Sequence, residues 1–70
     1  MIMRLNLADC REKAGLSLKD VSKILKIGVK TLEKYEAGVI SPKLDLGWEM
    51  SMLYRVPMGG INFSLDAQRA

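Results

Sequence analysis

Two short amphipathic segments, separated by only three residues, constrain this chain more than any other feature of its sequence. Their apolar residues recur at three- and four-residue spacing, which predicts helices over 18–25 and 29–36 with residues 26–28 between them. Ser17 is a good N-cap for the first helix, and Gly38 is a suitable C′ residue after the second. The spacing therefore predicts a helix-turn-helix.

Each of these helices has one apolar stripe and one polar face. The expected inward residues are Leu18, Val21, Ile24, Leu25, Ile27, Leu32 and Tyr35. The expected outward residues are Lys19, Lys23, Lys30, Glu33 and Lys34. The second helix should therefore present a polar, largely basic outer face.

Further helices are predicted over residues 5–14 and 43–55, and Gly15 should end the first of them. The expected inward residues of that first helix are Leu7, Cys10 and Ala14. We divide the chain into a helical domain, residues 1–57, and a C-terminal tail, residues 58–70. In the tail, 61–66 alternates apolar and polar residues, a strand pattern that leaves three alternatives open: a packed tail, a short helix, or an edge that pairs with another copy.

Length and composition exclude most catalytic sites. Seventy residues make one small domain, and a single cysteine with no histidine cannot assemble a structural zinc site or a Ser-His-Asp triad. We expect no enzyme, no metal and no cofactor, and we interpret Cys10 as a small buried hydrophobe rather than a reactive thiol. Neither a signal peptide nor a membrane span is recognisable, so a cytoplasmic protein is expected.

The excess positive charge lies on the predicted helix-turn-helix. Residues 17–43 contain six lysines and three acidic residues, which equals the whole net charge of +3. Such a basic patch indicates a surface that binds phosphates, and the alternative is a solvated face that serves solubility.

Several short motifs together resemble the Cro/CI-type (lambda-repressor-like, XRE family) helix-turn-helix regulators. The residues that carry the resemblance, within residues 4–57, are Leu16-Ser17, Ser22, Leu25-Lys26-Ile27, Thr31-Leu32, Tyr35-Glu36-Ala37-Gly38 and Pro42. The resemblance implies an all-α fold of four to five short helices and double-stranded DNA as the partner. It also implies an ion pair between Arg11 and Glu36, with two independent surface charges as the alternative.

The resemblance also assigns DNA contacts to individual residues. Base contacts fall on Val29, Lys30 and Lys34, although Val29 could instead pack at the helix start and the lysines could contact only phosphates. Phosphate contacts fall on Ser17, Lys19, Lys26, Gly28 and Lys43. Within the predicted helix-turn-helix, the sequence departs from the family pattern at three positions, where Leu18 replaces a glutamine, Lys26 a glycine and Gly28 a serine or threonine.

Apolar residues in the last third of the chain exceed what a core of three short helices can cover. They predict a homodimer through the fourth helix and the tail, and the residues expected at its interface are Trp48, Met52, Ile61, Phe63 and Leu65. The alternative is a tail that folds back on its own chain and dimerisation only on DNA. Gly47 stands where relatives carry a core leucine, and we expect Trp48 to fill the space it leaves.

The resemblance favours a sequence-specific regulator, a repressor or Cro-like switch of phage or mobile-element type without a small-molecule effector. The predicted recognition helix is 29–36, which would enter the major groove. The competing hypothesis is a protein-interaction module, such as an antitoxin or adaptor, that keeps the same fold.

Overall fold

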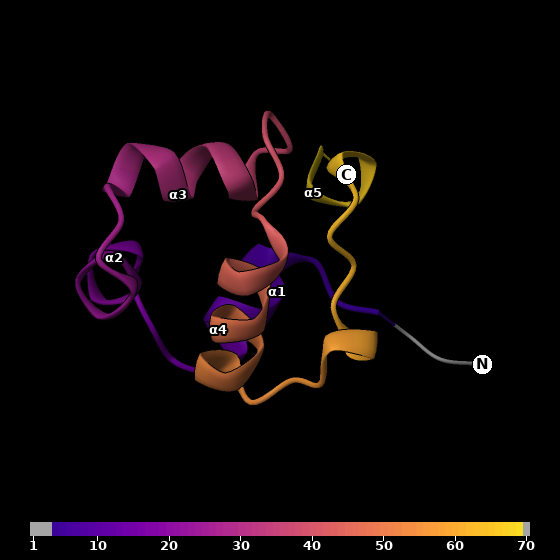
Figure 1. Cartoon of the computed structure of the whole chain (residues 1–70), viewed down its shortest axis with the longest axis horizontal. Coiled ribbons are helices and arrows are strands. Elements are labelled where there is room, and N and C mark those ends of the chain that lie inside the picture. The colour runs from indigo at the N-terminus through magenta and orange to yellow at the C-terminus, as the bar shows by residue number, and fades with distance from the viewer. Residues whose placement is uncertain (1–3, 70) are drawn as a thin grey trace.

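The computed structural model describes residues 4–69, which form short helices around one core (Figure 1). In chain order these are α1 (Leu7–Lys13), α2 (Leu18–Leu25), α3 (Val29–Glu36), α4 (Leu44–Tyr54), the 3-10 turn η1 (Met58–Gly60) and α5 (Leu65–Arg69). The predicted all-α fold is confirmed, and α2 and α3 begin and end at the predicted residues. In the described part of the chain, no helix is long and apolar enough to cross a membrane.

The helices α1 and α4 are one or two residues shorter at each end than the predicted 5–14 and 43–55. At the start of α1, the Asn6 side chain accepts a hydrogen bond of 2.8 Å from the backbone N–H of Asp9, so Asn6 caps the helix. Lys43 is likewise the N-cap of α4, and Arg55 ends that helix in the left-handed conformation. The helices predicted from the sequence included these capping residues.

The core takes residues from every part of the chain. Its buried apolar residues are Leu7, Cys10, Val21, Leu32, Met50, Tyr54 and Ile61. Two residues expected inward are exposed instead, Ala14 and Ile24. Ala14 lies beyond the last turn of α1, and Ile24 faces a surface depression that α2 shares with Met52 of α4.

The tail folds back onto its own chain. Leu5 and Ile61 form an isolated parallel bridge, in which the Leu5 N–H donates to Gly60 O at 2.9 Å and the Asn62 N–H donates to Leu5 O at 2.8 Å. Figure 1 shows the N-terminal segment passing beside this part of the tail. Further along the chain, α5 packs against the end of α3. Of the strand-like pattern, Ile61 pairs inside the monomer, whereas its last two residues, Leu65 and Asp66, begin the short helix α5.

Gln68 fixes α5 against the start of the chain. Its buried side chain accepts a 2.7 Å hydrogen bond from the Leu7 N–H at the first turn of α1. The same amide donates to Asn62 O at 2.6 Å and to Ser64 O at 3.0 Å. These bonds connect the tail to the first turn of α1.

Phe63 fills the space beside Gly47, so the prediction that Trp48 would do so is wrong. A Cβ atom at Gly47 would lie 3.3 Å from the Phe63 ring. Trp48 is 58% exposed on the outer side of α4. The missing side chain of Gly47 is thus replaced by a residue from the tail.

Candidate nucleic-acid interface

Two hydrogen bonds between Ser22 and Ile27 hold the turn between α2 and α3. The Ser22 hydroxyl donates to Ile27 O at 2.5 Å, and the Ile27 N–H donates to Ser22 O at 3.2 Å. Lys26 has a φ of 57°, a left-handed conformation that costs a non-glycine residue roughly 1 kcal/mol. Gly28 is the N-cap of α3 and supplies no side-chain bond. The turn therefore keeps its shape without the glycine and the capping hydroxyl that are usual in the resembled family.

The helix α3 turns its apolar side inward and its basic side to solvent. Leu32 is fully buried, whereas Val29, Lys30 and Lys34 are exposed. Figure 1 shows α3 along one edge of the molecule, with α2, α1 and α4 all on the same side of it. The two lysines are four residues apart and share a face, so both can reach one groove of a duplex. The three residues expected to contact bases thus lie together on an uncovered surface.

The residues expected to contact phosphates come from three elements. All are exposed, and they are Ser17, Lys19, Lys26, Gly28 and Lys43. Ser17 and Lys19 lie at the start of α2, Lys26 and Gly28 in the turn, and Lys43 before α4. Three of the five carry a positive charge that can neutralise a phosphate.

Ser17 already forms two hydrogen bonds inside a capping box. Its N–H donates to the Asp20 carboxylate at 3.0 Å, and its hydroxyl accepts from the Asp20 N–H at 3.0 Å. The hydrogen bonds from Ser17 lower the pKa of Asp20, which keeps this carboxylate charged. This negative charge lies beside Ser17, whereas the exposed Lys19 in the same turn carries a positive charge.

Arg11 and Glu36 form a bidentate ion pair between α1 and the end of α3. The Nε–Oε2 distance is 2.7 Å and the Nη2–Oε1 distance is 3.1 Å, with side chains only 14% and 10% exposed. Arg11 Nη1 also donates to Leu16 O at 2.9 Å. The hydrogen bond to Glu36 raises the pKa of Arg11. The pair fixes the last turn of α3 to α1 and to the turn before α2.

A family model described as helix-turn-helix, of the Cro/CI type, matches residues 7–61. The chain belongs to the Cro/CI-type helix-turn-helix family. This family consists of DNA-binding regulators, so the matched region is a DNA-binding helix-turn-helix. No curated protein and no solved structure matches the chain.

The expected dimerisation residues of this Cro/CI-type chain lie in three different environments. Trp48 and Met52 are 58% and 65% exposed on the outer face of α4. Ile61 is only 3% exposed and belongs to the core of its own chain. Phe63 and Leu65 are half-buried in the tail. The structure therefore does not bring the five residues into one surface patch.

Leu44 and Glu33 are two surface residues that the sequence analysis left without a role. Leu44 is 80% exposed and lies four residues before Trp48, on the same face of α4. The regular spacing of Leu44, Trp48 and Met52 could have revealed this stripe from the sequence. Glu33 is exposed on α3 beside the lysines, where its charge opposes theirs.

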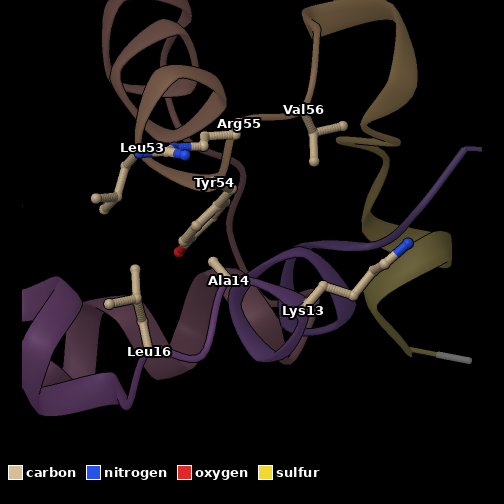
Figure 2. Close-up of a pocket in the computed structure, with 7 residues that line it drawn as sticks. All are labelled: Lys13, Ala14, Leu16, Leu53, Tyr54, Arg55 and Val56. Atoms are coloured by element: carbon tan, nitrogen blue, oxygen red, sulfur yellow. The ribbon is translucent and has the colours of Figure 1, made fainter.

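Tyr54 is a further residue whose environment the sequence did not predict. Its hydroxyl is buried without a hydrogen-bond partner among the described residues, and burial raises its pKa. Figure 2 shows its ring between the ends of α1 and α4, beside a surface pocket of about 550 Å³. Lys13 and Arg55 line this pocket at the two helix C-termini, where positive charge offsets the helix dipole. The pocket lining includes none of the residues expected to contact DNA.

Metal-ligating side chains do not gather anywhere in residues 4–69 in groups of three or more. Cys10 is fully buried, and desolvation raises the pKa of its thiol. A buried, protonated thiol is a poor nucleophile and a poor metal ligand. Cys10 therefore serves the core.

Proposed function

We propose that this chain binds specific sequences in double-stranded DNA as a homodimer and acts as a repressor or Cro-like switch. The observation that carries the proposal is the uncovered basic face of α3, with Val29, Lys30 and Lys34 side by side on a helix anchored at its far end by Glu36. A helix held in this way can enter the major groove as a rigid element.

Each residue of this face has a chemistry suited to a base edge. A lysine can donate to O6 and N7 of guanine, and the methyl groups of Val29 suit the methyl group of thymine. Lys19, Lys26 and Lys43 would contact the flanking phosphates, which supply affinity without sequence preference.

Binding of labelled duplexes at several salt concentrations tests this proposal. The logarithm of the affinity should fall linearly with the logarithm of salt concentration, with a slope of about −0.9 for each phosphate that is neutralised. Lys19→Ala should make the slope shallower, whereas Lys13→Ala, an exposed lysine at the end of α1, is the matched control and should leave it unchanged. Absence of binding to any duplex at low salt would contradict the proposal.

The homodimer is proposed through α4. One recognition helix reads only a few base pairs, so members of such folds gain specificity when a two-fold axis supplies a second helix. The stripe of Leu44, Trp48 and Met52 is exposed and apolar, which is typical of a surface that another protein covers. Since Ile61 is buried in its own chain, this interface excludes it.

Sedimentation of the full chain at tens of micromolar tests the dimer. Trp48→Ser should shift the chain toward monomer, and Val39→Ser, at a residue with nearly the same exposure outside α4, is the control. A wild-type chain that is monomeric both free and on DNA would contradict the homodimer.

The same apolar stripe supports one other candidate, a protein-interaction module such as an antitoxin or adaptor. In that case the α4 face would cover a different protein. Co-purification of a larger protein, lost with Trp48→Ser, together with no duplex binding at low salt, would favour this candidate over the DNA-binding regulator.

A further inference from the structure

The two carboxylates of α3 have different surroundings. Glu36 is 10% exposed and its two oxygens accept hydrogen bonds from Arg11. Glu33 lies one turn earlier and is exposed. Within residues 4–69 the ion pairs are Arg11 with Glu12 and Glu36, and Arg69 with Asp66, so Glu33 takes part in none. The structure thus explains the charge of Glu36 and leaves that of Glu33 without a protein partner.

Glu33 lies on the face that would enter DNA. It follows Lys30 by three residues and Val29 by four, which places all three on adjoining parts of the helix surface. A carboxylate in this position faces a duplex whose phosphates repel it, and desolvation of an unpaired charge is costly. A hydrogen-bond donor in the groove would offset this cost when α3 binds DNA.

We propose that Glu33 is a specificity-determining residue that accepts a hydrogen bond from the N4 amino group of a cytosine. This inference rests on the proposed binding of duplex DNA by α3. The major groove offers two amino donors, cytosine N4 and adenine N6. The adenine amino group lies between two acceptors, its own N7 and the O4 of thymine, whereas the cytosine amino group has an acceptor, guanine O6, on only one side. A carboxylate consequently meets less repulsion at a C·G pair.

Lys30, which lies beside Glu33, can contact the guanine that pairs with such a cytosine or one next to it. Guanine presents O6 and N7 as acceptors, so Lys30 can donate to the guanine of the same or a neighbouring pair. Glu33 and Lys30 together then read both strands at C·G pairs. At an A·T pair the only amino donor lies between two acceptors, so Glu33 also weakens binding to wrong sequences.

Selection of bound sequences from random duplex DNA, followed by affinity measurements on the selected and a scrambled duplex, tests the proposal. The wild type should select a cytosine at one position, and its replacement should weaken binding about tenfold. Glu33→Gln should select adenine at that position, because an amide can bond to both N6 and N7 of adenine. Compared with the wild type, Glu33→Gln should bind the duplex that the wild type selects more weakly and the scrambled duplex more tightly.

Glu12→Gln on α1 removes the same charge from a side chain that is 67% exposed, and it should leave the selected sequence unchanged. If Glu33→Gln selects the same sequence as the wild type and binds both duplexes more tightly, Glu33 only repels phosphates and the proposal is wrong. That result leaves duplex binding by α3 intact, whereas a wild type that binds no duplex at low salt overturns both proposals.

Discussion

The two ends of α3 are built in opposite ways. The last turn is held by Arg11, which bonds to Glu36, and by α5, whose Arg69 Nε donates to Gly38 O at 3.1 Å. The first turn has Gly28 as a cap without a side-chain bond and exposes Val29 and Lys30. Stability is therefore concentrated at the last turn of α3, whereas the proposed recognition uses its solvent-exposed face, which carries Val29, Lys30 and Lys34, so mutations should separate the two.

The largest effect on stability should come from Gly38→Ala, which adds a methyl group where the anchored end of α3 meets α5. A Cβ atom there would lie within van der Waals overlap of the Leu65 carbonyl oxygen, and the φ of +74° disfavours any side chain. We expect a loss of about 3 kcal/mol in the free energy of unfolding, measured by urea denaturation.

Gly15→Ala is the matched control for this change. Gly15 has the same φ of +74°, but a Cβ atom there would meet nothing within 4 Å. Its cost should be only the conformational penalty of about 1 kcal/mol. Equal losses for the two variants would mean that α5 does not press on the end of α3.

Removal of the ion pair should have the next largest effect. Glu36→Gln leaves the nearly buried Arg11 guanidinium with only the exposed Glu12 carboxylate, 3.9 Å away, as counter-charge, and we expect a loss of about 2 to 3 kcal/mol in stability. Arg11→Met should cost a similar amount. A double-mutant cycle measures the coupling, and a coupling energy near zero would remove this pair from the anchored end.

On the exposed face of α3, Lys34→Ala should reduce binding without reducing stability, because the Lys34 side chain points to solvent although it lies in the last turn. We expect a loss of roughly 1 to 3 kcal/mol of binding free energy on the selected duplex and relaxed preference at one base position. Lys19→Ala should weaken all duplexes alike, since it removes only a phosphate contact. An equal effect of Lys34→Ala on selected and scrambled duplexes would assign Lys34 to phosphates instead.

The smallest effect should arise in the turn that leads into the exposed end. Lys26 has a positive φ that glycine adopts freely, so Lys26→Gly should stabilise the fold by up to about 1 kcal/mol, less the added entropy of the unfolded chain. The same variant should bind every duplex more weakly if Lys26 contacts a phosphate. Thermal denaturation and duplex binding measure the two changes separately.

Local signals were sufficient to predict the helix-turn-helix. The cap at Ser17, the glycine at Gly38 and the spacing of apolar residues determine where α2 and α3 begin and end, because these signals act within a few residues. The resemblance added the meeting of Arg11 and Glu36, which are 25 residues apart and which periodicity alone does not connect.

The tail was beyond the reach of local signals. Its alternating pattern indicated a strand. Whether this pattern finds a pairing partner within the monomer depends on Leu5, which lies near the other end of the chain and pairs with Ile61. The contact of Phe63 with Gly47 is equally non-local. Such pairings are decided by tertiary packing. The sequence pattern shows only that the last third of the chain has more apolar residues than three short helices can cover.

The hydrogen bond between the Leu7 N–H and Gln68 has a consequence for synthesis of the protein. Its two partners are 61 positions apart, so the first turn of α1 leaves the ribosome long before the side chain that bonds to it exists. During that interval α1, α2 and α3 have been synthesised but cannot pack against α5. A nascent chain stopped just before Gln68 would contain the whole recognition helix and still lack the bond that joins the two ends of the fold.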